Sequence, residues 1–587
     1  MEAFNDAQKR NAMRGNEFWS YAVDTLQRSI LFLDTLRVRG NIYRQHIEAG
    51  QPPVLHFPYE KIADGRDLDP PVNYSLFRIH DRRKKDRQAS GDRKEKAPVV
   101  IIDPRAGHGP GIGGIKEDSE IGVAINDGHP IYGIFFSPDP VDGQTIAHVE
   151  QTEARFLEMI ISFHPQGDKP IIIGNCQGGW AAALLAADRP DLVGSVLLNG
   201  TPLSYWAGPE GKSPMRYRGG LVGGLWMASF LSDLGGGLLD GAMLVANMED
   251  LNPAHTLWKK QYYLYEHIDT EINRYLTFEK WWGGFFPLTR QETRFIVGDL
   301  FIGNKLEGGE LLLDSGRRVD LKNISAPLIL FASLGDNITP PQQALNWITK
   351  IYKSEKEIIR KKRRIVYVLH DSIGHLGIFV SANVAKKEHR AIMENMAAFH
   401  ELQPGLYEMI VDEDALDEEG KRKGSVVRFE ERTFDDIRHI DGGSHYEALF
   451  SEVARMSDYC DRQYRLFFRP WVRLYTTPWT AELNRQAHPL RWSRSLFSDL
   501  NCFMLPVGPT AELVRAHRHE EPPENPYRAV ESHIADHVAA SLDLFRDVRD
   551  ATQEYAFKAF FGNPLLKWTA QLCNAITAGD GDKARER

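Results

Sequence analysis

The sequence is poor in cysteine. Only four cysteines occur in 587 residues, at positions 176, 460, 502 and 573. Cysteines so few and so widely spaced argue against a disulfide framework and indicate a reducing compartment, so we expect a cytoplasmic protein. No group of cysteines and histidines has the spacing of a zinc site, so we expect no metal. We also expect no bound cofactor.

Long apolar runs and an excess of positive charge are absent as well. No uncharged apolar stretch is long enough for a transmembrane helix, and the first ten residues, MEAFNDAQKR, lack the apolar core of a secretory signal. The net charge of −9 gives no reason to expect nucleic-acid binding. The length is sufficient for a large core and more than one domain.

A regular alternation of apolar runs and helical patterns occupies the middle of the chain. Continuous apolar strands that alternate with helices predict an α/β fold with a mainly parallel sheet covered on both faces. The expected strands are 99–103, 131–136, 171–173, 195–198, 328–332 and 364–369, and the expected helices are 150–163, 180–187 and 341–352.

The flanking regions lack this alternation. Residues 1–50 have near-helical apolar spacing that ends at Pro52 and Pro53. The stretch 201–320 is rich in glycine and aromatic residues, as expected of a cap inserted into the α/β domain. The predicted division is an N-terminal helical region 1–96, an α/β domain 97–400 with its cap at 201–320, a charged linker 401–425, a helical region 426–577 and a disordered tail 578–587.

One short motif carries most of the functional information. In PIIIGNCQGGW, residues 170–180, an apolar strand runs into a glycine turn with Cys176 at its apex, and a helix of small residues follows. This is the strand–elbow–helix signature of an α/β-hydrolase nucleophile, with cysteine in the usual place of serine. The alternative is an inert buried thiol, because free cysteine packs as a small hydrophobe.

A nucleophilic cysteine needs a base and a group that orients the base. In this fold the chain order is nucleophile, acid, histidine. Asp336 follows an apolar strand in a Gly-Asp turn, and its alternative role is to cap the next helix. His375, between Gly374 and Gly377, is the predicted base, and His370, nearer the strand end, is its competitor.

An oxyanion hole needs two backbone N–H donors. The first is expected from Gln177, the residue after the nucleophile, and the second from the glycine-rich loop 104–114, at Arg105 or Ala106. The same loop contains a formal G-x-G-x-x-G at 109–114. The acidic stretch that follows argues against dinucleotide binding there.

The choice of cysteine over serine favours thioester chemistry. An acyl group on cysteine is a thioester, as it is on coenzyme A, so it stays activated for transfer to another acceptor. A thiol is also closer to ionisation than a hydroxyl. These points favour acyl transfer but do not exclude hydrolysis.

The motifs together resemble those of polyhydroxyalkanoate synthases. The segment 174–179 resembles the synthases' lipase-like box G-x-C-x-G-G, 303–311 and 319–327 resemble the stretch before their acid strand, and 336–340 and 374–377 resemble their acid and histidine motifs. The similarity covers roughly residues 97–400. Asn337 stands where the synthases have histidine, so the chain looks like a synthase-like bacterial branch rather than a standard synthase.

The resemblance implies a catalytic set of Cys176, Asp336 and His375 and a hydroxyacyl-CoA donor, with coenzyme A as part of the substrate. Arg105, Asn175 and Trp180 are the predicted substrate contacts. The alternatives are a thioesterase or polyester depolymerase with the same triad, or a non-catalytic granule-binding scaffold. The amphipathic stretches 21–44 and 529–560 are candidates for a polymer-granule surface, against packing on the catalytic domain or a homodimer interface.

Overall fold

The structure is a computed structural model that describes residues 2–81, 96–313, 316–412, 415–416, 422–424, 426–441 and 447–564. The predicted tail 578–587 lies outside the described residues. The described chain divides into two compact units. The sheet unit holds Pro52–Gly241, Phe286–Glu482 and the described residues from Thr552 onward, and the helical unit holds the chain up to Gln51, Ala242–Phe285 and Leu483–Ala551.

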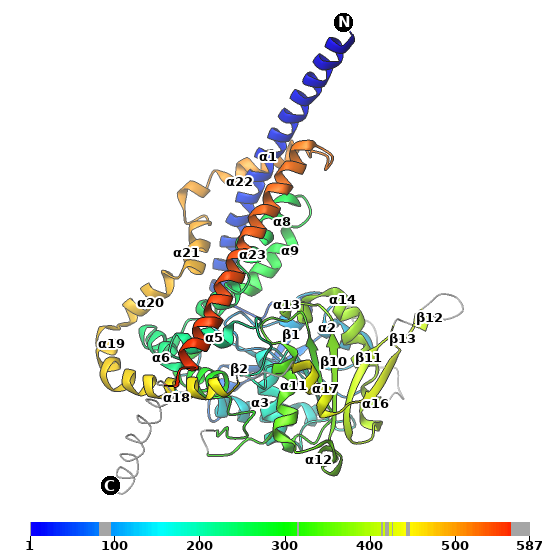
Figure 1. Ribbon diagram of the computed structural model, residues 1–587, viewed down its shortest axis with the longest axis vertical. Helices are drawn as coiled ribbons and strands as arrows, with labels where there is room; N and C mark the ends of the chain where they lie inside the picture. The colour runs from blue at the N-terminus through cyan, green and yellow to red at the C-terminus, as the bar shows by residue number, and fades with distance from the viewer. Residues whose placement is uncertain are drawn as a thin grey trace. The chain divides into compact units, whose positions relative to one another are not determined.

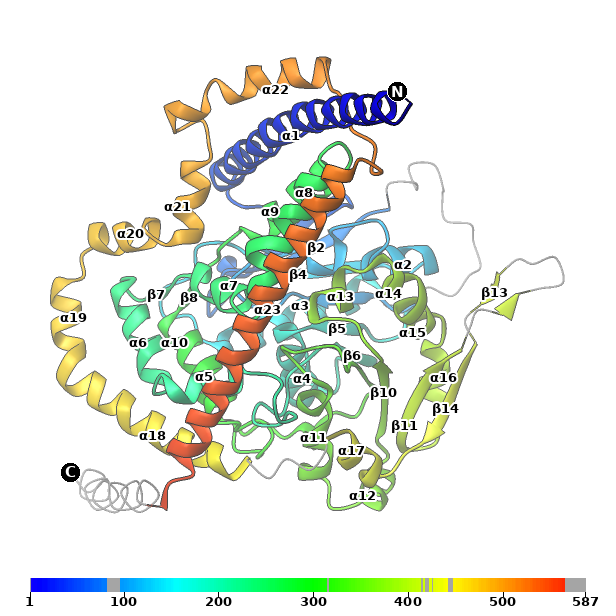
Figure 2. The ribbon, with the colours of Figure 1, turned by 45° about the horizontal axis from the view of Figure 1, so that its top comes forward.

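The sheet unit is built on a ten-stranded sheet (Figure 2). Its central strands are parallel and fully buried because each is a continuous apolar run. Across the sheet the order is β1 (Tyr59–Asp64), β2 (Tyr74–Ile79), β4 (Ile131–Phe136), β3 (Val99–Ile102), β5 (Ile171–Asn175), β6 (Ser195–Asn199), β9 (Leu328–Ser333), β10 (Arg364–His370), β11 (Gly405–Val411) and β14 (Val427–Glu431).

Helices connect the parallel strands and cover the sheet. The main ones are α2 (Glu120–Asp127), α3 (Ile146–Phe163), α4 (Gln177–Asp188) and α11 (Pro341–Ile351). α3 packs against α4, and α2 packs against α15 (Arg390–Glu394). The predicted α/β-hydrolase fold is therefore confirmed: a strand order with β3 between β4 and β5, antiparallel β2, and an elbow after β5.

The sheet extends beyond both predicted limits of the catalytic domain. β1 and β2 lie before residue 97, and β11 and β14 lie after residue 400, so the boundaries at 97 and 400 are wrong for the sheet. β1 pairs antiparallel with β2, and β14 pairs antiparallel with β11, at the two edges. Edge strands are half exposed and lack a continuous apolar run, which is why the sequence pattern missed them.

The helical unit combines three distant segments. α1 (Glu2–Glu48) lies beside α8 (Lys260–Glu266), α9 (Ile272–Trp282) and α22 (Val507–Ala516) (Figure 1). Their shared core contains Leu31, Leu36, Leu264, Ile268, Tyr275, Ala511 and Val514. Within the described residues, no helix is long and apolar enough to cross a membrane.

Candidate active site

The turn between β5 and α4 is a strained elbow. Cys176 has φ +50° and ψ −118°, a backbone conformation that residues other than glycine rarely adopt. A Cβ at Gly178 would meet the Ile102 carbonyl, and one at Gly179 would meet the Thr201 side chain. The small residues around Cys176 are therefore required by the close approach of strand and helix.

Asp336 and His375 meet Cys176 from loops that follow β9 and β10. His375 Nδ1 lies 2.6 Å from Asp336 Oδ2, and His375 Nε2 lies 3.2 Å from Cys176 Sγ. The other carboxylate oxygen of Asp336 accepts the backbone N–H groups of Ile338 and Thr339, each at 2.8 Å. These bonds fix the carboxylate, which in turn fixes the imidazole so that Nε2 faces the sulfur.

His370, the competing histidine, lies elsewhere. Its Nδ1 accepts the backbone N–H groups of Ser372 and Ile373, and its Nε2 lies 3.9 Å from Glu388. The structure thus brings His375, and not His370, to Cys176.

Charge and burial act in opposite directions on the active-site histidine. Burial lowers the pKa of His375, but the nearby charges of Asp336 and Cys176 outweigh it and raise the pKa to about 10. His108, on the loop after β3, is buried and bonds Gly109 O through Nδ1. Burial lowers its pKa to about 4, with a smaller contribution from the charge of His375. The two imidazoles near the site are therefore shifted in opposite directions, His375 toward its charged form and His108 toward its neutral form.

The two predicted oxyanion donors differ in their environment. Gln177 is the first residue of α4, where backbone N–H groups have no partner within the helix. The N–H of Ala106 instead donates to Pro104 O at 3.0 Å, because the chain makes a tight three-residue turn after β3. The structure therefore does not fit the prediction for Ala106.

Tyr205 is a neighbour that the sequence did not indicate. It is buried, and its hydroxyl has no hydrogen-bond partner among the described residues. Burial raises its pKa well above the usual value, and the charge of Cys176 adds to the shift, so the phenol lies within electrostatic range of the nucleophile. A buried hydroxyl without a partner is a donor that a ligand can use.

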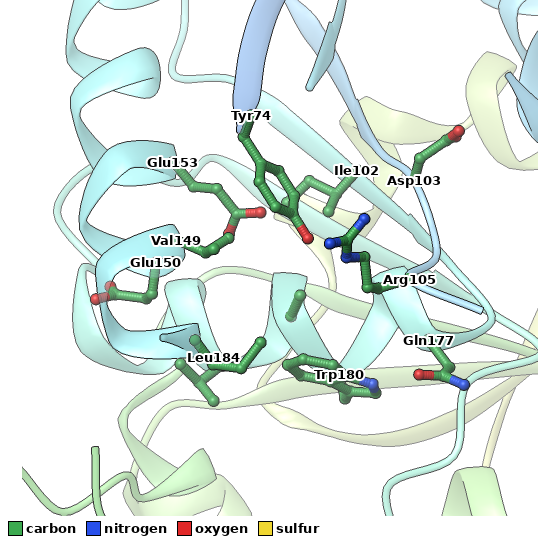
Figure 3. A pocket seen from close by; sticks show the side chains of 12 residues that line it. Tyr74, Ile102, Asp103, Arg105, Val149, Glu150, Glu153, Gln177, Trp180 and Leu184 are labelled. Carbon is green, nitrogen blue, oxygen red and sulfur yellow. The ribbon is translucent and has the colours of Figure 1, made fainter. Parts of the chain in front are cut away.

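The predicted substrate contacts Arg105 and Trp180 line a small cavity beside the elbow helix (Figure 3). Its volume is about 10 Å³, which is the space of a single water. Arg105 and Tyr74 point toward one another there, and the Arg105 guanidinium pairs with Glu292 at 3.3 Å. The cavity is too small for an acyl chain, so substrate contact by these two side chains stays a prediction.

Asn175 belongs to a buried polar network beneath the elbow. Its amide donates to Glu120 at 2.7 Å, and its side-chain oxygen accepts from Asn199 at 3.0 Å. Asn199 also donates to Glu120, and His389 Nε2 lies 3.4 Å from the same carboxylate. Asn175 therefore hydrogen-bonds within the protein, to Glu120 and Asn199. These contacts differ from the substrate contact that was predicted for it.

The site holds no obvious place for a metal. Among the residues that the structure describes, no group of three or more histidine, cysteine, aspartate or glutamate side chains is arranged to bind one.

Comparisons with known proteins place the chain in a family and identify more distant relatives. Residues 24–585 match a protein family described as "Protein of unknown function (DUF3141)". The chain is 46% identical over 558 residues to "Uncharacterized protein in ackA 5'region" of Rhizobium meliloti, a match that covers 94% of this chain and 75% of the relative. It is 25% identical over 315 residues to the "Poly(3-hydroxyalkanoate) polymerase subunit PhaC" of Thiocystis violacea, covering 52% of this chain and 81% of that protein.

A solved structure, the monoacylglycerol lipase of Paleococcus ferrophilus, aligns at a TM-score of 0.31 with 15% identity, covering 52% of this chain and 97% of the lipase. A likeness this slight bears on no activity. The polymerase subunit matches confirm the similarity to polyhydroxyalkanoate synthases that the motifs predicted. The 46% identical relative is described as an uncharacterized protein, not as a synthase.

Proposed function

The chain belongs to this family of proteins of unknown function, and from its site we propose that it is an acyltransferase of the polyhydroxyalkanoate synthase type. Its donor is a (3-hydroxy)acyl-CoA thioester and its nucleophile is Cys176. The observation that carries the proposal is the continuous chain of short contacts from Asp336 through His375 to Cys176 on a strained elbow.

In the first step the Cys176 sulfur attacks the thioester carbonyl, and His375 holds the thiol proton. The backbone N–H of Gln177 stabilises the oxyanion. The carbon–sulfur bond to coenzyme A then breaks, and the leaving thiolate takes the proton from His375. Asp336 keeps the imidazole oriented and stabilises its positive charge, a role supported by the raised pKa of His375.

In the second step an acceptor hydroxyl gives its proton to His375 and attacks the Cys176 thioester. The carbon–oxygen bond forms, the carbon–sulfur bond breaks, and Cys176 recovers the proton. With water as the acceptor the same steps release a free acid, and the protein is then a thioesterase or depolymerase. The 25% identity to a poly(3-hydroxyalkanoate) polymerase subunit favours an organic acceptor over water.

The test is release of coenzyme A from 3-hydroxybutyryl-CoA, followed by mass spectrometry of the intact protein and its peptides. We expect an acyl adduct on Cys176 and loss of release in Cys176→Ala. Cys460→Ala is the matched control, because Cys460 is a partly buried free thiol of the same unit. Absence of Cys176-dependent release with acyl-CoAs of several chain lengths overturns the proposal, and a free hydroxy acid as the sole product favours the hydrolase.

A further inference from the structure

A long helical segment of the sheet unit exposes many of its apolar side chains. α18 (Glu447–Gln463) continues through the π-helical turn η8 (Tyr464–Phe468) into α19 (Arg469–Tyr475). α18 and α19 lie beside α6 (Leu225–Leu234) (Figure 1, Figure 2). The contacts toward α6 include hydrogen bonds, in which Ser229 donates to Asp461 and Tyr464 donates to Asp233, and ring contacts of Tyr464 with Trp226 and Phe230.

The apolar side chains of α18 are partly in the core, where Phe450 and Val453 are buried, but those from Leu466 onward are exposed. Phe467, Trp471, Leu474 and Tyr475 recur at the spacing of one helical face, and each is at least 61% exposed. Leu466, Phe468 and Trp479 add to the same exposed set. An amphipathic helix normally turns its apolar stripe to the core, so an outward stripe of this size indicates an interaction surface.

The charged side chains of residues 462–481 are all positive. Residues 462–481 contain four arginines, at 462, 465, 469 and 473, and no aspartate or glutamate, in a chain whose net charge is −9. Arg465 and Arg469 pair with the buried Asp461 and Asp233. Arg290 and Arg294 pair with the same two aspartates, so the arginines around the segment outnumber these carboxylates.

A hollow of about 480 Å³ opens beside α19. Its lining has both signs of charge: Arg290 and Arg473 face it, and so do Asp142 and Asp233, together with Gly236, Gly237, Gln291 and Thr476. Burial lowers the pKa of Arg290, and the charges of Arg469 and Arg473 lower it further, although Asp233 opposes them. Arg473 therefore places an exposed guanidinium at this hollow, on the same helix as the exposed aromatic side chains, where a phosphate group can bind it.

We propose that residues 462–481, here called the aromatic-basic ledge, dock on an anionic phospholipid surface. The aromatic side chains enter the interface, where tryptophan and tyrosine place an apolar body and a polar tip, and the arginines with the hollow at Arg473 bind headgroup phosphates. The segment lies on the surface rather than crossing it.

The charge pattern favours an anionic bilayer over two other candidates, a second copy of this chain and a polyester surface. Two copies of the ledge placed face to face would bring arginines together without carboxylates to pair them. A polyester surface is uncharged and offers no partner to the arginines. An anionic bilayer satisfies both the apolar face and the positive charge.

The experiment is flotation of the full-length protein with vesicles of phosphatidylcholine alone or of equal parts phosphatidylcholine and phosphatidylglycerol. We expect binding to the anionic vesicles only. Raising the salt from about 0.1 M to about 1 M should weaken it strongly, because the screening length falls from about 10 Å to about 3 Å. Trp471→Ser with Leu474→Ser should reduce partitioning by about tenfold or more.

Arg462→Gln with Arg473→Gln tests the charge separately, and we expect it to abolish the preference for anionic lipid. The control is Phe163→Ser with Ile359→Ser, which removes two exposed apolar side chains of the same unit outside the ledge. Unchanged circular dichroism establishes that each variant is folded.

Three outcomes overturn the proposal: equal binding to neutral and anionic vesicles, binding to polyester particles but not to vesicles, or a concentration-dependent dimer that Trp471→Ser with Leu474→Ser disperses. None of these measurements depends on acyl transfer, so the ledge and the proposed function can fail independently.

Discussion

At the scale of the residue, Asp336 controls the protonation of His375. Burial lowers the pKa of His375, and the Asp336 carboxylate is the largest influence that raises it, to about 10. We expect Asp336→Asn to lower the pKa of His375 towards or below its ordinary value of about 6.5. NMR titration of the His375 imidazole measures this pKa directly, and a value unchanged in the variant would contradict the role of Asp336.

Stability provides the control for this prediction. Because folded His375 binds its proton more tightly than unfolded His375, its stabilising effect is fully present below about pH 6.5 and is lost as pH rises through about 10. Thermal unfolding of the native protein should therefore show a fall in midpoint over this window that Asp336→Asn reduces. Identical pH profiles for the two proteins would contradict the proposed coupling.

Tyr205 gives a second prediction at this scale. The Ala106 N–H is bonded to Pro104, whereas the buried Tyr205 hydroxyl has no partner among the described residues and lies within range of the Cys176 charge. We expect the hydroxyl to donate to the oxyanion, so Tyr205→Phe should lower kcat by about 10²-fold or more with little change in KM. A Tyr205→Phe variant with normal kcat, or one that loses KM alone, assigns the hydroxyl to another role.

At the scale of the element, the sequence predicted what local periodicity determines. The buried parallel strands and the helices after them were found because a continuous apolar run or a helical stripe is legible without knowledge of neighbours. The edge strands β1 and β14, and β11 next to β14, were not separated from the predicted flanking regions, because their burial depends on a partner strand. α19 lies within the predicted helical region 426–577, but a helical pattern alone does not say which side of a helix faces the protein.

The same distinction applies to the candidate site. Cys176, Asp336 and His375 lie in motifs at strand ends, and the fold brings their side chains together. Glu120 and Asn199 are 79 positions apart and meet only beneath the elbow. Tyr205, whose pKa is influenced by Cys176, lies in the loop after β6. None of these three residues lies in a motif, so only the three-dimensional arrangement identifies them.

At the scale of the whole molecule, an ion pair within the helical unit joins segments from near the two ends of the chain. Arg28 of α1 is buried and donates to both carboxylate oxygens of Glu531, at 2.8 and 2.9 Å, and to Asp24 at 2.7 Å. Glu531 lies on α23 (Pro526–Phe561) and also accepts from Tyr21. The folding of this unit therefore depends on residues 503 positions apart in sequence.

We expect Arg28→Met to destabilise the protein by about 3–5 kcal/mol, because it leaves buried carboxylates with fewer partners. The exposed pair Arg44–Glu48 on the same helix is the control, and Arg44→Met should cost about 0–1 kcal/mol. Urea unfolding followed by circular dichroism measures both, and a double-mutant cycle with Glu531→Gln isolates the pair.

The pH dependence tests the same pair from the side of the carboxylate. Burial raises the pKa of Glu531, but its hydrogen bonds from Arg28 and Tyr21 outweigh that and hold it below its ordinary value. Its stabilising effect is thus present above about pH 4.5 and lost as pH falls through the lowered pKa. Arg28→Met should flatten this acid limb, whereas equal acid sensitivity of Arg28→Met and Arg44→Met would show that the pair does not hold the unit together.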